Sequence, residues 1–510
     1  MDTKALRQKI LDLAIRGRLV PQDPNDEPAS VLLERIREQK QQMVKEGKLK
    51  KKDIKNDSVI FVGEDNLHYE KFQDGTVKCI EDEIPFDVPE GWTWARLKHI
   101  CMMAAGKAKS TDQIKPKPFE GCYPCFGGNG IRGYVEEYNQ NGTFSIVGRQ
   151  GALCGNINIA SGKFYVTEHA VVTTLFGGID FNWSNYILEA LRLNKYATGA
   201  AQPGLSVANV LNVFVPVPPT QEQIHIGIKI AKSIKIIENI ANEKEDLQTL
   251  LSDTKSKILA LAIRGQLVLQ NPDDEPAFAL LERICAEKEE LIKQGKLKRD
   301  KKESTIFKGE DNSYYLKDGQ LTININDALP FDIPDSWCWT RLKDVFVINP
   351  RNKLNDDLDV SFIPMPLIDD GYSGKHTSEV RPWKEVKTGF THFAEGDVGV
   401  AKITPCFENR KSTVFKHLSN GYGAGTTELH VLRPYGNTIL AQYLLAYIKS
   451  DFFIENGKQS FTGAVGQQRI SKEYVEGAYF PLPPIKEQER IIHQISNVFE
   501  YINIISDALS

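Results

Sequence analysis

The segment ILDLAIRGRLV at residues 10–20 returns almost unchanged as ILALAIRGQLV at residues 258–268. A segment that recurs far along one chain is the mark of a repeated unit. Four further segments return in the same order, and they are DEPASVLLERI (26–36) with DEPAFALLERI (274–284), EGKLK (46–50) with QGKLK (294–298), PFDVPEGWTWARL (85–97) with PFDIPDSWCWTRL (330–342), and PVPPTQEQ (216–223) with PLPPIKEQ (481–488). Two copies of one unit therefore make up nearly the whole chain. Two copies are too few for a solenoid, so we expect a pseudo-twofold tandem repeat.

The two copies agree at their ends and differ in their middles. Residues 98–210 and 343–475 show little mutual similarity. Short β-branched and aromatic runs alternate there with Gly, Asn and Asp turns, which predicts mixed α/β structure, with helices at 183–196 and 438–454. A shared frame that holds two unlike inserts indicates one scaffold with two different recognition surfaces.

A helical pattern follows each proline motif. In the first copy it predicts a helix of about 45 residues that starts at Thr220, where Thr220 and Gln223 fit a capping box; Ile485 cannot form one in the second copy. Apolar residues at spacings of three and four predict coiled-coil seams. The seam residues are Ile230, Ile234, Ile237, Ala241, Leu247, Leu251, Thr254, Ile258 and Leu261 in the first copy, and Ile491, Ile495, Val498, Ile502, Ile505 and Leu509 in the second.

The segment at 258–268 continues the first long helix, whereas its twin at 10–20 stands near the start of the chain. If the C-terminal helix meets the N-terminal helix, the two fragments rebuild a second long helix that pairs antiparallel with the central one. The alternative is that residues 10–20 supply a core helix to their own domain. In that case Gly17 and Gly265 act only as C-terminal helix stops.

Composition is typical of a soluble globular protein of two to four domains, with 41% hydrophobic and 25% charged residues in 510. No apolar run is long enough to cross a membrane, and the first residues do not form a signal peptide, so we expect a cytoplasmic location. The net charge is −4, but residues 93–220 hold 11 Lys and Arg against 7 Asp and Glu. Basic runs at 48–55 and 296–302 also permit contact with phosphates.

Polar side chains that can read base edges or bind phosphates concentrate in the turns of the two middles. We predict DNA contacts from these side chains, which are Asn129, Arg132, Arg149, Gln150 and Asn156 in the first middle, and Lys402, Thr404, Asn409, Arg410 and Lys411 in the second. For any one of them, a solvated loop or turn-stabilising role is the alternative.

Catalytic and metal-binding motifs are missing from the sequence. There is no phosphate-binding loop, no H-E-x-x-H and no G-x-S-x-G, and NPRN at 349–352 is not an adenine methyltransferase tetrad. IDD (368–370) and EVK (385–387) only loosely resemble a nuclease site, and His169 and His430 are expected to be packed rather than catalytic. A stand-alone methyltransferase or nuclease, and a scaffold without a DNA role, are the alternatives to a DNA-recognition subunit.

The chain resembles the specificity subunit (HsdS) of type I restriction-modification systems. The resemblance rests on the tandem layout, the two P-x-P-P-x-x-E-Q motifs that lead into helices, GRQGALCGNIN, and GDVGVAKITPCFEN with GTTELHVLRP. It implies a non-catalytic protein whose two target-recognition domains each read one half of a bipartite, asymmetric DNA site. It also implies two modification (HsdM) subunits and restriction (HsdR) subunits as partners, which would carry S-adenosylmethionine, ATP and Mg, with no cofactor on this chain.

The expected fold class is therefore an α+β multidomain chain, in which two mixed α/β target-recognition domains are joined by a long antiparallel coiled-coil helix pair. The expected domains are an N-terminal helix segment (1–20), a helical and basic extension (21–80), recognition domain 1 (81–219), a central helix (220–268), a second extension (269–325), recognition domain 2 (326–484) and a C-terminal helix (485–510).

The rebuilt second helix predicts that the two chain ends lie close together. Spin labels at Thr3 and Ser506 should then report a distance far shorter than the length of the 220–268 helix, which is roughly 70 Å at 1.5 Å per residue. A label-to-label distance that approaches that helix length would rule the arrangement out.

Overall fold

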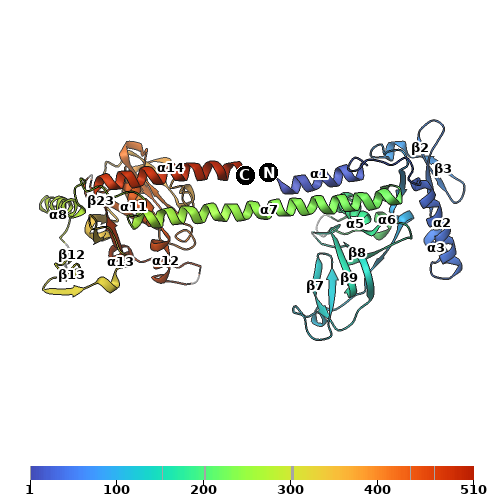
Figure 1. Cartoon of the computed structure of the whole chain (residues 1–510), viewed down its shortest axis with the longest axis horizontal. Helices are drawn as coiled ribbons and strands as arrows, with labels where there is room; N and C mark the ends of the chain where they lie inside the picture. The colour runs from blue at the N-terminus through green and yellow to red at the C-terminus, as the bar shows by residue number, and fades with distance from the viewer. Residues whose placement is uncertain are drawn as a thin grey trace. The chain divides into compact units, whose positions relative to one another are not determined.

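The computed structural model describes residues 2–151, 153–199, 203–299, 304–436, 438–464 and 466–509 (Figure 1). The chain forms two compact units, residues 1–243 and 244–510. The helix α7 (Thr220–Ile263) is 44 residues long and contributes its first part to the first unit and the rest to the second. Among the described residues, no helix combines the length and the apolar character that crossing a membrane requires.

The first unit opens with helices and a small sheet and continues into a larger sheet. Its elements before α7 are α1 (Thr3–Ile15), α2 (Ala29–Lys45), α3 (Lys51–Ile54), β1 (Ser58–Val62), β2 (His68–Phe72), β3 (Val77–Cys79), η1 (Glu81–Glu83), β4 (Thr93–Arg96), α4 (Leu97–Ile100), β5 (Cys101–Ala105), η2 (Thr111–Gln113), β6 (Tyr123–Gly127), β7 (Gly130–Val135), β8 (Gln140–Gly148), β9 (Ile157–Val166), β10 (Ala170–Leu175), α5 (Phe181–Ala190), η3 (Leu193–Tyr196), α6 (Val207–Leu211) and β11 (Phe214–Val217).

The second unit has the same order of elements at its ends. Its elements after α7 are α8 (Ala277–Lys293), β12 (Ser304–Lys308), β13 (Tyr314–Asp318), β14 (Leu321–Asn324), η4 (Asn326–Ala328), β15 (Cys338–Arg341), α9 (Leu342–Val345), β16 (Phe346–Ile348), β17 (Asp359–Ile363), η5 (Met365–Leu367), β18 (Glu379–Pro382), α10 (Trp383–Val386), β19 (Thr391–Ala394), β20 (Val398–Ala401), β21 (Ser412–Val414), η6 (Ser419–Gly421), β22 (Tyr422–Gly425), β23 (Leu429–Pro434), α11 (Ala441–Ile448), α12 (Asp451–Gln459), α13 (Lys472–Gly477), β24 (Tyr479–Leu482) and α14 (Ile485–Leu509).

The frames of the two units match, and their middles do not. Each frame has a three-stranded sheet, β1-β2-β3 or β12-β13-β14, and a two-stranded ladder, β4 with β11 or β15 with β24. The first middle is a six-stranded sheet of order β5-β10-β8-β9-β6-β7, whereas the second has two four-stranded sheets, β16-β23-β20-β21 and β18-β17-β22-β19. The expected mixed α/β character of both middles agrees with this structure.

Both helices that we predicted in the middles are interrupted. The first ends at Ala190, because Arg192 has a left-handed conformation with φ 50°, and a 3-10 turn follows. The second divides at Ser450, whose extended backbone ends α11 and whose side chain accepts from the N–H of Phe453 to start α12. Apolar periodicity continues through both breaks, so it hides them.

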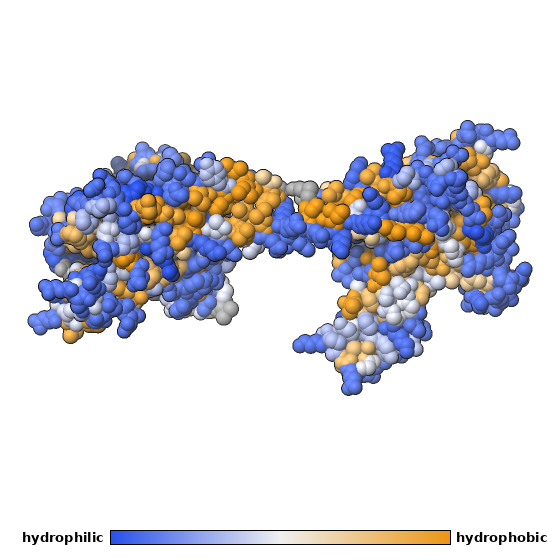
Figure 2. All heavy atoms as spheres, viewed as in Figure 1, coloured by the Kyte–Doolittle hydropathy of each residue, from blue (hydrophilic) through white to orange (hydrophobic). Residues whose placement is uncertain are grey.

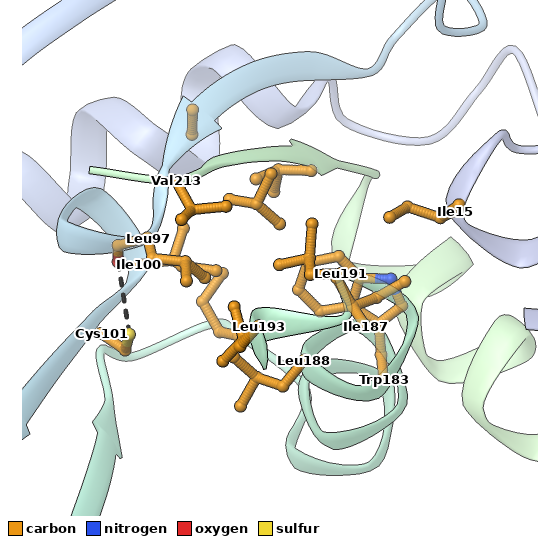
Figure 3. Packing of buried hydrophobic residues seen from close by; sticks show 14 of the residues in the cluster. Ile15, Leu97, Ile100, Cys101, Trp183, Ile187, Leu188, Leu191, Leu193 and Val213 are labelled. Atoms are coloured by element: carbon orange, nitrogen blue, oxygen red, sulfur yellow. Dashed lines mark hydrogen bonds between the residues drawn. The ribbon is translucent and has the colours of Figure 1, made fainter. Parts of the chain in front are cut away.

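The segment at 10–20 is part of the core of the first unit. Leu11, Ala14 and Ile15 of α1 are buried in one cluster with Ile226 and Ile230 of α7. Figure 3 shows Ile15 facing the side of this cluster where Trp183, Ile187 and Leu191 of the α5 region lie. This segment thus supplies a core helix to its own unit.

The buried face of the long helices follows the predicted seams only in part. Ile230, Ile234 and Ile237 are buried. Near the end of α7 the prediction was wrong, because Leu261 is 38% exposed and the buried residues are Leu259, Ala262 and Ile263. The last turns of α7 face the core of the second unit rather than continuing the seam.

On α14, Ile491 and Ile502 are buried but Ile505 is 45% exposed, and Figure 2 shows hydrophobic atoms along this helix.

Each proline motif ends in a buried Glu-Gln pair. The Gln223 side chain donates to the carbonyl of Pro218 (2.9 Å) and accepts from the N–H of Asp180 (2.8 Å), the residue that caps α5. Gln488 repeats this with Pro483 (3.0 Å) and Leu440 (2.9 Å), at the start of α11. The two long helices are thereby fixed to equivalent helices of their units.

The prediction of a capping box at Thr220 is wrong, because the side chains of Thr220 and Gln223 bind other groups. The Thr220 hydroxyl donates to the carbonyl of Gly178 (3.2 Å), and the Gln223 side chain is engaged with Pro218 and Asp180 instead. The helix start is held from outside by the neighbouring segment, so the second start needs no capping residue at Ile485.

The glutamates of the same motifs bind the segments that flank the repeat. Glu222 accepts from the indole of Trp92 (2.8 Å) and the amide of Gln22 (3.1 Å), and Glu487 accepts from Gln270 (2.6 Å). Burial raises the pKa of both Glu222 and Glu487. In the first unit these contacts join the segment after residue 20, the tryptophan segment and the long helix at one point. In the second unit Ser336 of the tryptophan segment donates to Gln270 (3.0 Å), which reaches the long helix through Glu487.

A half-buried arginine follows the second tryptophan in both frames, but its acidic partner differs. Arg96 pairs with Glu70 of β2 through two hydrogen bonds (2.8 and 2.6 Å). Arg341 pairs with Asp344 of α9 (3.3 Å) and also donates to Ser304. At the positions that correspond in sequence, Leu316 replaces the glutamate and His99 replaces the aspartate.

At Gly17 and Gly265 the backbone of the repeated segment packs directly against a proline and a tryptophan. Both have positive φ, +64° and +67°. A Cβ would lie 2.4 Å from the Cγ of Pro89 or Pro334 in each case, and 3.1 Å from the ring of the tryptophan that follows. These glycines therefore end their helices and also let the chain pack directly on the proline-tryptophan segment.

We predict that Gly265→Ala lowers the free energy of unfolding by about 3 kcal/mol, because it adds a steric clash to the cost of a left-handed alanine. Gly295→Ala is the matched control, since φ is +71° and nothing lies within 4 Å of its Cβ. It should cost only about 1 kcal/mol. Denaturant unfolding of the two full-length variants measures the difference, and equal losses would contradict the packing role.

Candidate nucleic-acid interface

Three of the five candidate residues of the first middle line one concave surface. It has a volume of about 450 Å3, and Asn129, Arg132 and Gln150 line it. Asn129 lies in the turn between β6 and β7, Arg132 is on β7, and Gln150 follows β8. Asn156 joins this surface by donating to the side-chain oxygen of Asn129 (3.3 Å).

The side chains at this surface differ in how firmly they are held. The Gln150 oxygen lies 2.6 Å from Nδ1 of His169, and Arg132 donates to the hydroxyl of Thr111 (3.0 Å). The Arg149 side chain forms no hydrogen bond or ion pair with any described residue of the chain. A guanidinium without an internal partner is free to bind a base edge or a phosphate.

The five candidates of the second middle lie on the loop between β20 and β21, and two of them are engaged inside the protein. The Arg410 guanidinium donates to the carboxylate of Asp451 and lies over the ring of Tyr372 at 5.1 Å. The ammonium of Lys411 donates to the carbonyl of Ile368 (2.8 Å). These contacts hold the loop in place, so Arg410 and Lys411 have a structural role in the unbound chain.

Lys402, Thr404 and Asn409 are less constrained. Within the described ranges, the side chains of Lys402 and Asn409 have no hydrogen-bond partner. The hydroxyl of Thr404 is buried without a partner. Of the second set, Lys402 and Asn409 are the side chains available to a ligand.

A buried lysine holds the same loop through hydrogen bonds to its backbone. Lys449, at the end of α11, is 3% exposed, and its ammonium donates to the carbonyls of Gly371 (2.5 Å) and Arg410 (2.8 Å). Burial lowers its pKa to about 7. The loop that carries Asn409 is therefore joined to the loop at residue 371, also through the N–H of Gly371 and the carbonyl of Asn409 (2.8 Å).

One pair of loops was missed by the sequence reasoning. The triplet Thr-Gly-Ala occurs at 198–200 and again at 462–464. Thr198 exchanges two backbone hydrogen bonds with Gly204, and Thr462 does the same with Arg469. The triplet is short and lies within the dissimilar middles, so only a comparison at the late offset of about 265 would have found it.

The residues that follow the two Thr-Gly-Ala triplets hold one candidate residue each in the same way. The N–H of Leu205 donates to the carbonyl of Arg149 (2.8 Å), and that of Ile470 donates to the carbonyl of Lys402 (2.9 Å). Arg149 and Lys402 thus occupy equivalent backbone positions in two sheets of different topology. A basic side chain is presented beside the same loop in both units.

The family model of the type I restriction modification DNA specificity domain matches residues 89–249 and 334–509. The chain belongs to this family. The matched ranges include all ten candidate residues and both Thr-Gly-Ala loops.

Curated relatives of this DNA specificity family are similar over part of the chain. The type I restriction enzyme EcoAI specificity subunit of Escherichia coli is 48% identical over 236 residues, which are 46% of this chain and 37% of the relative. The EcoEI specificity subunit of Escherichia coli is 43% identical over 259 residues, 51% and 40% of the two chains. The chain thus spans about two fifths of the length of these relatives. A solved HsdS subunit from Thermoanaerobacter tengcongensis aligns with 84% of this chain and 93% of its own, at 14% identity and a TM-score of 0.40.

The two histidines expected to be packed behave differently. His430 is buried, and burial lowers its pKa to about 4. His169 corrects the expectation, because its side chain is 40% exposed and lies at the concave surface beside Gln150. The strand-like run ends before His169, which lies in the turn that leads into β10.

The loose nuclease-like pattern does not form a site. Asp369 accepts from the hydroxyl of Ser373 (2.6 Å), and Lys387 donates to Asp356 (2.8 Å). In the described part of the chain, no group of three or more His, Cys, Asp or Glu residues is placed to hold a metal ion.

We predict that two arginines of the interface differ in their effect on the melting temperature and on DNA binding. Arg410→Ala should lower the melting temperature by about 2 °C, because Asp451 and Tyr372 lose their partner. Arg149→Ala should leave the melting temperature nearly unchanged and weaken DNA binding, since its side chain forms no hydrogen bond or ion pair with a described residue. Thermal unfolding and a DNA-binding titration of both variants test this, and a destabilised Arg149→Ala protein would contradict it.

Proposed function

We propose that the chain is the DNA specificity subunit of a type I restriction-modification complex. The observation that carries this proposal is that two matched frames hold two unlike middles, each with a basic residue beside an equivalent loop. A frame that recurs places the recognition surfaces, and the differences between the middles give two different DNA half-sites.

In this proposal residues 81–219 and 326–484 are the target-recognition domains. Arg149 and Gln150 would contact one half-site, and Lys402 and Asn409 the other. Asn129, Arg132, Asn156, Thr404, Arg410 and Lys411 complete the proposed set. Arg and Asn or Gln suit this role, because each can make paired hydrogen bonds to a purine edge. The contacts found at Arg410 and Lys411 support a positioning role for these two.

The long helices would form the spacer between the half-sites. Contacts within each unit support an antiparallel arrangement: Gln22 with Glu222 in the first, and Lys255 with Asn503 (2.7 Å) and Gln270 with Glu487 in the second. We propose that α1 and α14 follow one another along α7 and make the molecule pseudo-twofold. In that arrangement residues 1–20 would complete the helix that ends at 485–510.

The modification subunits would dock on the helices and supply S-adenosylmethionine, while restriction subunits would supply ATP-driven cleavage. Exposed apolar side chains support a docking role for the end of α14, where Tyr501, Ile504 and Ile505 are 70%, 58% and 45% exposed. The chain itself would read DNA without catalysing a reaction. The extensions at 21–80 and 269–325 belong to the frame in this proposal, since each contains the three-stranded sheet that packs beside the tryptophan segment.

We predict that replacing residues 98–210 with the corresponding segment of a relative changes only one half of the methylated DNA sequence. The β4–β11 ladder lies outside these residues, so the frame is retained. Mapping of methylated adenines in cells that carry the complete system measures both half-sites at once. A swap of 343–475 is the matched control and should change only the other half. Unchanged halves in a folded variant, or a change in both, would refute the assignment.

A further inference from the structure

A second concave surface lies in the second unit, beside the loop that carries Asn409. It has a volume of about 490 Å3 and is formed by the 373–378 loop, the turn at 414–417 and α11. Lys375, Lys416 and His417 line it, and all three are exposed. None of the ten residues predicted from the sequence is part of it.

The charged side chains that line this surface are both positive. Among the described residues no carboxylate lines it, and neither Lys375 nor Lys416 forms an ion pair there. Two carboxylates lie at its edge and are hydrogen-bonded to its backbone and hydroxyl groups: Glu395 accepts from the N–H groups of His417 (2.8 Å) and Leu418 (2.9 Å), and Asp369 accepts from Ser373. Two unpaired ammonium groups in one hollow favour an anion.

The ring of His376, which lines the hollow, has a buried nitrogen without a hydrogen-bond partner in the described chain. The Nε2 of His376 accepts from the backbone N–H of Lys416 (3.2 Å), so the proton of the neutral ring is on Nδ1. Burial lowers the pKa of His376, which keeps the ring neutral near pH 7. Nδ1 is buried and has no partner in the described chain.

Hydrogen bonds hold the loop at this surface in place. The hydroxyl of Thr413 donates to the carbonyl of Gly374 (2.7 Å), and Lys449 holds Gly371. The hydrogen bond from Gly371 to Asn409 makes the hollow continuous with the candidate DNA-reading loop. An anion in the hollow would therefore lie at the edge of that loop.

We propose that this hollow binds one phosphate of the DNA backbone beside the second half-site. The proposal rests on the proposed function, and it adds a contact that positions the second recognition domain without reading bases. Lys375 and Lys416 neutralise the phosphate, and the hydroxyl-bearing 373–378 loop supplies neutral donors. Because a phosphate is the same at every base pair, this contact contributes equally to cognate and random DNA.

The test uses the full-length chain, purified with the subunits that assemble with it, and the double variant Lys375→Ala/Lys416→Ala. Affinity for cognate and random duplexes is measured across a range of salt. The double variant should bind both duplexes about tenfold more weakly, and the slope of log affinity against log salt should fall in magnitude by about 0.9, the value for one phosphate. The methylated sequence should stay the same.

Lys71→Ala/Lys317→Ala is the control, because it removes the same charge from exposed positions on β2 and β13, which lie outside the recognition loops and the docking helices. A double variant of the hollow that behaves like this control would overturn the proposal, as would a change in the methylated sequence, which would mean that bases are read there. Inorganic phosphate is titrated separately. If phosphate binds while DNA affinity is unaffected by the double variant, the hollow holds a free anion and the proposal fails.

The outcome is separable from that of the proposed function. A wild-type complex that binds all duplexes equally would refute the specificity function. A fall in the salt slope of the double variant would still support the phosphate contact in that case.

Discussion

The buried glutamine at the start of each long helix is the contact on which each unit depends. Gln223 and Gln488 are fully buried, and an amide buried without partners would cost several kcal/mol. Both find partners in the carbonyl of the preceding double proline and the N–H at the start of a neighbouring helix. The prolines hold the chain extended so that this carbonyl is available. The direction of each long helix is therefore fixed by a neighbouring helix that belongs to the middle of the same unit.

The glutamate beside this glutamine extends the constraint to the rest of the frame. Glu222 binds Trp92 and Gln22, so residues from three separate parts of the chain meet at the first turn of α7. Gly17 then packs on Pro89 without space for a side chain. The segments that recur in the sequence are the ones that meet here, so their similarity reflects one shared packing arrangement, used twice.

The frame was predictable from the sequence because repetition shows which segments are constrained together. The middles were not, since their topology depends on long-range strand pairing that a single sequence does not show. Helix breaks at Arg192 and Ser450 depend on one backbone conformation each, within continuous apolar patterns. Residue type identified Arg149 and Arg410 as equal candidates, yet only the structure distinguishes them, because Asp451 is distant in sequence from its partner. Neither the Thr-Gly-Ala loops nor the hollow at Lys375 and Lys416 has a periodic pattern that would mark it.

The different acids that pair with Arg96 and Arg341 have a consequence for how such genes can recombine. Two similar frames in one gene invite crossovers between them. A hybrid that joins the second extension, with Leu316, to the first tryptophan segment, with Arg96 and His99, leaves the half-buried guanidinium without either acid. The reciprocal hybrid contains both Glu70 and Asp344 around one arginine. A charge left without its acid in a half-buried site is destabilising, so exchange across this junction is penalised. Exchange of residues 98–210 leaves Arg96 with Glu70, whereas exchange of residues 343–475 also replaces Asp344, the acid of Arg341. The frame therefore disfavours hybrids between the two repeats, and the middle of the first unit can be replaced without disturbing the pair of Arg96 with Glu70.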